Sequence, residues 1–296
     1  MKNLDGIHHV TCITGDAPRN VEYYAGTLGL RLVKKSVNQD DPTVYHLFYA
    51  DEQGTPGSDI TFFEYPGAAP GRAGSGMIHT VVWRVASEEA VDFWRDRVGS
   101  VPFTDPEGLR HDLVVSNVPD RPLIADDPEI PHELALQGFE GVRAYASDLD
   151  RNTAFLAALG FENGETRGET RGGWIHYEES PGPGAPGAGT VHHVAWACPM
   201  DEQEAWRTRV EEAGGRPTPI IDRFWFHSIY FREPSGVLFE IATLGPGFAA
   251  DEDPAHLGEA LILPPDFEHL RAEVEPMLTP LPDPRQGRAG TGSRRS

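Results

Sequence analysis

The chain has 296 residues, with 25 lysines and arginines against 46 aspartates and glutamates, and a formal charge of -21. Such a surface repels phosphate, so we expect no nucleic-acid partner. Two cysteines, Cys12 and Cys198, cannot build a disulfide framework, and no apolar run is long enough for a membrane span. Composition therefore predicts a cytoplasmic protein without a membrane segment.

Self-similar segments recur along the chain. Residues 15–32 (GDAPRNVEYYAGTLGLRL) align with residues 147–163 (SDLDRNTAFLAALGFEN), and both predict an amphipathic helix. Each helix is expected to begin at an aspartate cap and to end at a glycine, which adopts the left-handed conformation easily. The expected caps are Asp16 and Asp148 at the N-termini and Gly29 and Gly160 at the C-termini.

Residues 76–98 and 189–210 also align, and each predicts a strand followed by a helix. Every unit then closes with a short β run that a glycine opens, as in GVLFEIAT. The repeat predicts four β-α-β-β-β modules paired into two halves, which is an α+β fold. The expected parts are an N-terminal half (1–118), a connector (119–137), a C-terminal half (138–245), and a C-terminal helix with a disordered tail (246–296).

Adjacent histidines occur twice on apolar strands, in GIHHVT and in GTVHHVAW. Side chains alternate between the two faces of a strand, so only one histidine of each pair is expected on a given face. The repeat aligns His8 with His192 and His9 with His193. A single histidine of this kind is also compatible with a hydrogen-bonded core residue.

A glutamate, Glu240, interrupts the apolar run VLFEIAT. A buried carboxylate needs a compensating partner, because its desolvation is costly. Two imidazoles and one carboxylate form the arrangement that binds non-haem Fe(II), so His9, His193 and Glu240 are the candidate metal ligands. The alternative is a structural ion pair between Glu240 and Arg223 or Arg232.

The stretches GIHHVTCITGDAPRN, GSGMIHTVVWRV, TVHHVAW and DRFWFHSIYFREPSGVLFEIATLGPGFAADE resemble the vicinal oxygen chelate superfamily. This superfamily includes glyoxalases, bleomycin-resistance proteins and ring-cleaving dioxygenases, and the resemblance is closer to the hydroquinone-type dioxygenases. It implies one metal between the first and fourth modules, on the three candidate ligands. It also implies roles around the metal or the substrate for His8, Thr11, His192, Arg223 and Tyr230.

The resemblance implies an Fe(II)-dependent extradiol-type enzyme, with Mn(II) as the alternative metal, that inserts both atoms of O2 into a hydroquinone- or catechol-type diol. A homo-oligomer is compatible with it. Glu64 stands where relatives tend to carry proline, and a glutamate nearby can be a fourth ligand in glyoxalase-like modules. A metal-dependent lyase or isomerase and a non-catalytic resistance protein are therefore the competing functions.

Several of these side chains also have ordinary structural interpretations. His192 is a candidate base or a core histidine, Tyr230 can be a packing residue, and Arg223 can form a surface ion pair. Aromatic residues of the segment FWFHSIYF either wall a substrate pocket or belong to the core. These aromatic residues are Phe224, Trp225, Phe226 and Phe231.

Overall fold

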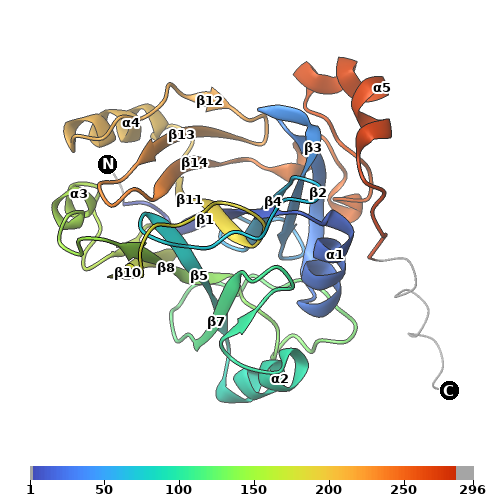
Figure 1. Cartoon of the computed structure of the whole chain (residues 1–296), viewed down its shortest axis with the longest axis horizontal. Coiled ribbons are helices and arrows are strands. Elements are labelled where there is room, and N and C mark those ends of the chain that lie inside the picture. Colours follow the sequence, from blue (N-terminus) through green and yellow to red (C-terminus); the bar gives the residue numbers. More distant parts are fainter. Residues whose placement is uncertain (1–2, 285–296) are drawn as a thin grey trace.

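The computed structural model describes residues 3–284, so the disordered tail expected at residues 285–296 lies outside the described residues. Within that range, fourteen strands form two mixed sheets that lie against each other (Figure 1). No helix in the described range 3–284 has the length and apolar character that crossing a membrane requires.

The larger sheet has eight strands in the order β12-β13-β14-β11-β1-β4-β3-β2. It joins the first module to the fourth, because β1 pairs with β11 at the centre. The strands of the first module are β1 (Ile7–Thr14), β2 (Arg31–Asn38), β3 (Asp41–Ala50) and β4 (Asp59–Glu64). Those of the fourth are β11 (Thr190–Cys198), β12 (Ile221–Asp222), β13 (Phe226–Arg232) and β14 (Leu238–Pro246).

The smaller sheet has six strands in the order β6-β7-β5-β8-β10-β9 and joins the second module to the third. Each sheet therefore draws strands from both predicted halves of the chain. The second module contributes β5 (Met77–Val85), β6 (Phe103–Thr104) and β7 (Arg110–Val115). The third contributes β8 (Phe139–Ala146), β9 (Glu165–Arg167) and β10 (Gly172–Glu179).

The strand order β-α-β-β-β is complete in the first and fourth modules, whereas two strands follow the helix in the second and third. In the second module, residues 105–109 connect β6 directly to β7. The module helices are α1 (Ala17–Val21, continued by the π-helical η1, Glu22–Thr27), α2 (Glu88–Val98), α3 (Thr153–Ala158) and α4 (Gln203–Glu212).

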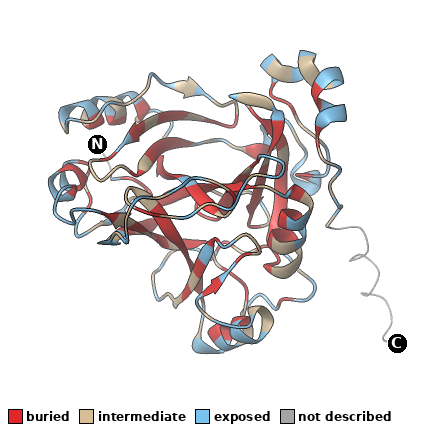
Figure 2. Ribbon diagram, viewed as in Figure 1, coloured by how far each residue is buried: buried red, intermediate tan, exposed pale blue. Residues whose placement is uncertain are grey.

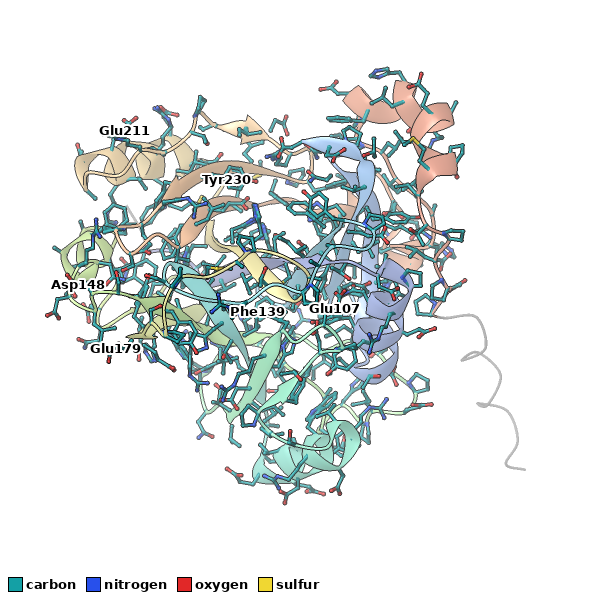
Figure 3. All side chains as sticks on the ribbon, in the orientation of Figure 1. Glu107, Phe139, Asp148, Glu179, Glu211 and Tyr230 are labelled. Carbon is teal, nitrogen blue, oxygen red and sulfur yellow. The ribbon has the colours of Figure 1, made fainter. Side chains whose placement is uncertain are left out.

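The capping predictions are confirmed at three of four positions. Asp16 accepts a hydrogen bond from the backbone N of Arg19 at 3.1 Å, and Gly29 and Gly160 have positive φ angles of 68° and 90°. Asp148 is wrong as a helix cap. Its carboxylate accepts from the backbone N of Asp150 at 3.1 Å, in a turn that delays the start of α3 until after Asn152 (Figure 3).

The segment after β14 runs along β2 rather than forming one long helix. The expected helix is reduced to the short α5 (Arg271–Val274), between 3-10 turns at Pro265–Leu270 (η4) and Glu275–Met277 (η5). Two more 3-10 turns, η2 (Phe248–Ala250) and η3 (Pro254–His256), precede them. The Nζ of Lys34 on β2 donates to Asp251 at 2.7 Å, which fastens this segment to the sheet.

Burial is concentrated on the strands of both sheets (Figure 2). The larger sheet carries a separate apolar cluster, which packs against the segment after β14 and adjoins the candidate site. Its buried members are Val33, Phe48, Ala50, Ala195, Trp225, Phe226, Ala242, Phe248 and Leu257.

Candidate metal centre

Three neighbouring strands, β1, β11 and β14, bring His9, His193 and Glu240 together. The Nε2 atoms of the two histidines lie 3.3 Å apart, and Glu240 Oε2 is 3.2 Å from His9 Nε2 and 2.9 Å from His193 Nε2. All three side chains are buried, with Glu240 at 0% exposure. The three ligands predicted from opposite ends of the sequence thus form one cluster of potential metal ligands.

A β-bulge explains how each pair of adjacent histidines reaches this cluster. Between β1 and β11 the register skips His8 on one strand and His192 on the other, so each is the extra residue of a bulge. Simple alternation predicts that the two rings of a pair point to opposite faces. The bulge turns the extra histidine so that its ring contacts the ring of its neighbour.

His8 determines the hydrogen position on His9. Nε2 of His8 lies 3.1 Å from the carbonyl oxygen of Thr243, and Nε2 carries the hydrogen because a carbonyl can only accept. Burial, followed by the nearby His9, lowers the pKa of His8 to about 3, so the ring is neutral at pH 7. Nδ1 of His8 then accepts from Nδ1 of His9 at 2.9 Å, which leaves a lone pair on His9 Nε2.

The second pair repeats this contact. Nδ1 of His192 lies 2.8 Å from Nδ1 of His193, and burial, followed by the nearby His193, lowers the pKa of His192 to about 4. By analogy with His9, we assign the shared hydrogen to His193 Nδ1. The lone pair of His193 Nε2 then also points at the cluster.

Glu240 is ionised in this environment. Burial alone would raise its pKa, but positive charge at His9 and His193 holds the pKa of Glu240 well below its usual range, so the carboxylate needs a cation beside it when both imidazoles are neutral. Ser228, on the neighbouring β13, donates its hydroxyl to Oε1 at 2.5 Å. The other oxygen, Oε2, is buried and has no hydrogen-bond partner within residues 3–284.

These donors fit a divalent metal ion. Two imidazole lone pairs and one orphaned carboxylate oxygen converge on one point, and an Nε2 atom without hydrogen cannot satisfy that oxygen by donation. A cation among the three atoms satisfies all of them at once. Two imidazoles and one carboxylate are the facial donor set of non-haem Fe(II), which leaves coordination positions for other ligands.

A cavity opens beside the cluster, and Thr11, Arg223 and Tyr230 lie on its wall. Tyr230, labelled in Figure 3, projects from β13, where it pairs in register with Glu240. Arg223 donates Nε to the Tyr230 hydroxyl at 3.3 Å and bonds the exposed carboxylate of Asp40 through both Nη atoms, at 3.2 and 3.0 Å. Arg223 therefore combines both alternatives, a surface ion pair and a place at the cavity.

His8 and His192 do not line this cavity, and each contacts one of the candidate ligands from behind the wall. Trp225 and Phe226 do line it, whereas Phe231 packs in the main core. Phe224 packs against the separate apolar cluster. The remaining lining residues are Asn38, Gln39, Asp40, His46, Phe48 and Phe63, together with His9 and His193.

The ion-pair alternatives for Glu240 do not occur among the described residues. Arg223 bonds Asp40, and Arg232 donates to the carbonyl of Gly236 at 2.7 Å. Glu64 lies outside the ligand cluster. Its carboxylate accepts from the backbone N of Ala17, at the start of α1, at 3.1 Å and from the Thr279 hydroxyl at 3.2 Å. Glu64 thus connects a helix and the C-terminal segment to the sheet.

Two residues at the site were missed from the sequence, Ser228 and His46. Ser228 precedes Tyr230 by two positions, so alternation in the segment FHSIYF places both on the face of Glu240, and this signal was available. His46 lies on β3, next to Phe48 and Phe63, and the equivalent position of β13 in the fourth module holds Ser228 rather than a histidine.

Comparison with known proteins places the chain among related sequences. The model of the "Glyoxalase/Bleomycin resistance protein/Dioxygenase superfamily" matches residues 6–110 and 138–241. The chain is 36% identical to "Putative ring-cleaving dioxygenase MhqA" of Bacillus subtilis, covering 94% of this chain and 99% of the relative. It is 32% identical to "Chlorohydroquinone/hydroquinone 1,2-dioxygenase" of Sphingobium indicum, covering 92% and 95%.

Solved structures agree. A "putative dioxygenase" from Bacillus subtilis superposes with a TM-score of 0.86 at 37% identity, covering 95% of this chain and 99% of that one. A glyoxalase I from Zea mays superposes with a TM-score of 0.51 at 16% identity, covering 82% and 93%. The second likeness concerns the fold alone, and together the matches confirm the predicted module architecture.

Proposed function

Because this chain belongs to the glyoxalase, bleomycin resistance protein and dioxygenase superfamily, as its motifs predicted, we propose that it is an Fe(II)-dependent ring-cleaving dioxygenase. Its substrate is a hydroquinone- or catechol-type diol, and both atoms of O2 enter the product. The observation that carries the proposal is the convergence of His9, His193 and Glu240 beside a cavity whose wall includes the two histidines and several aromatic rings. The similarity to a chlorohydroquinone/hydroquinone dioxygenase supports it.

His9, His193 and Glu240 would hold the metal. A bound Fe(II) ion supplies electron transfer between the ring and O2 and favours the deprotonated form of the phenol. The protein supplies one negative charge at this point, from Glu240, so a dication held there would keep a net positive charge. His8 and His192 hold the two imidazole rings in their orientation.

Tyr230 would donate a hydrogen bond to a substrate oxygen. Its hydroxyl accepts from Arg223 Nε, and an arginine can only donate, so the tyrosine keeps its own hydrogen for donation. Burial raises the pKa of Tyr230, which keeps this hydrogen in place at neutral pH. The guanidinium of Arg223 adds positive charge beside the oxygen atoms on which negative charge develops.

The test measures oxygen consumption. The protein is loaded with Fe(II) under anaerobic conditions and then mixed with air-saturated solutions of hydroquinones and catechols. We expect one O2 to be consumed per diol. When 18O2 is used, we expect the ring-opened acid to contain two 18O atoms. Turnover of a diol without O2 uptake, with Zn or Ni as the active metal, would instead establish the lyase or isomerase. Unchanged ligand binding by metal-free protein, without turnover, would establish the resistance protein.

A further inference from the structure

A histidine outside the ligand cluster faces the same cavity. His46 lies on β3, between the rings of Phe48 and Phe63, with ring centroids 3.9 and 4.4 Å away. Its side chain is half-buried, and it lines the cavity together with His9 and His193. The two aromatic contacts fix the plane of the imidazole, so the ring is held rigidly at the cavity wall.

A hydrogen-bond chain connects this histidine to the metal side of the cavity. His46 Nε2 lies 2.9 Å from the hydroxyl of Thr61, which donates to the hydroxyl of Thr11 at 2.9 Å. We assign the hydrogen between the two threonines to Thr61, so that Thr61 accepts from His46 and Nε2 of His46 carries the hydrogen. The remaining nitrogen, Nδ1, therefore presents a lone pair and has no hydrogen-bond partner in the part of the chain that the structure describes.

The strand register gives the separation between His46 and the metal ligand His9. Strands β1, β4 and β3 are neighbours in that order. His9 pairs with Asp59 of β4 and His46 with Phe63, four residues further along, so two strand spacings and this offset separate the backbones of His46 and His9 by roughly 16 Å. His9, His193 and His46 line one cavity, so a substrate ring with one oxygen at the metal cluster would extend its opposite edge toward His46. The imidazole is neutral there, because burial lowers the pKa of His46 well below its usual value.

We propose that His46 is a specificity-determining residue whose Nδ1 accepts a hydrogen bond from the substrate hydroxyl farthest from the metal. This inference rests on the proposed function. A para-diol places its second hydroxyl at the opposite end of the ring, where His46 lies, whereas an ortho-diol keeps both oxygens at the metal end. His46 thereby favours hydroquinones over monophenols and over catechols.

The test is calorimetric binding of hydroquinone and of 4-fluorophenol to the Fe(II)-loaded protein under argon, so that no turnover occurs. Fluorine is close in size to a hydroxyl but cannot donate a hydrogen bond. We expect the wild type to bind hydroquinone about 2- to 10-fold more tightly, the range that one net hydrogen bond provides. His46→Phe keeps an aromatic ring between Phe48 and Phe63, and we expect it to bind both compounds equally.

His227→Phe makes the same change on β13, outside the cavity lining, and should leave the preference intact. Thr61→Val deletes the partner that holds the hydrogen on Nε2 of His46, so it should reduce the preference even if His46→Phe fails to fold. A full preference in folded His46→Phe or in Thr61→Val would overturn the role of His46. Failure of the wild type to bind either phenol would instead overturn the proposed function.

Discussion

Both sheets contain the same cradle, by which we mean a central strand (β11 or β5) and its two neighbouring strands. Within residues 3–284, only the cradle of the larger sheet carries a cluster of potential metal ligands. In the larger sheet, Ala195 of β11 pairs with His9 of β1 and with Glu240 of β14. In the smaller sheet, Val82 of β5 pairs with Gly141 of β8 and with Asp112 of β7. Gly141 and Asp112 therefore stand where His9 and Glu240 stand.

The bulges are repeated as well. The register of the smaller sheet skips His79 and Glu140, the counterparts of His192 and His8. His79 even contacts its neighbour in the same way, with Nδ1 2.9 Å from the hydroxyl of Thr80, the counterpart of His193. The central strand pairs of the two sheets, β1 with β11 and β5 with β8, thus carry their bulges at corresponding positions.

The side chains fill the smaller cradle differently. Arg143, the counterpart of Thr11, donates to Asp112 at 2.7 Å, and the ring of Trp174 covers Gly141 so closely that an added Cβ would lie 2.1 Å from it. A guanidinium thus compensates the carboxylate, where the larger sheet offers imidazole lone pairs. Strand order and bulges thus create a place for a cation in both sheets. The side chains at three positions decide whether this cation is the guanidinium of Arg143 or a metal ion taken from solvent.

The largest expected effect is a difference in iron binding and O2 consumption between variants of Glu240 and of its counterpart Asp112. Glu240→Gln should lower bound iron and O2 consumption by more than roughly 100-fold, because it removes the charged ligand of the cluster. Asp112→Asn makes the equivalent change in the smaller sheet and should leave both unchanged. Metal analysis and an oxygen electrode measure the difference. Full iron content in Glu240→Gln would refute the proposed site.

The next effect concerns the bulged histidines. His8→Phe removes the ring that orients His9, and we expect the affinity for Fe(II) to fall about 10- to 100-fold. His79→Phe changes the matching bulge of the smaller sheet and should not alter it. A competition titration with a chelator under argon measures both. Equal effects of the two variants would show that the loss reflects the fold rather than the ligand orientation.

A third effect is on stability and belongs to the smaller sheet. Arg143→Met leaves the carboxylate of Asp112 without its partner, and we expect the free energy of unfolding to fall by about 1 to 2 kcal/mol. The estimate is modest because both side chains are partly exposed. Urea unfolding measures it, and the double variant with Asp112→Asn should recover part of the loss. No recovery would mean that the pair is not coupled.

The smallest effect is a pH dependence. His111, beside Asp112 on β7, has its pKa lowered by burial to about 3, whereas the unfolded value is near 6.5. Between these values the unfolded chain binds more protons, so stability falls as the pH drops through this window. From about pH 6 to pH 5, the wild type should lose about 1 kcal/mol more than His111→Gln. Parallel pH profiles would contradict the buried neutral state.

Much of the candidate site was predictable because it depends on residue type and repeat position. Histidine pairs and an isolated glutamate in apolar strands are conspicuous, and the repeat aligned His9 with His193 before any contact was known. Alternation failed for His8 and His192, because a bulge depends on the partner strand and leaves no composition signal. His46 was missed for a related reason, since its relation to the cavity is set by pairing across two strands.

The amino-acid sequence by itself determined the module repeat, the family and the three candidate ligands, because these follow from local periodicity and from the chemistry of the side chains. Only the tertiary structure decided which modules share a sheet, where the bulges turn the histidine rings, and that Arg143 occupies the second cradle. The physical reason is that register and the balance of buried charge arise from contacts between strands far apart in the chain.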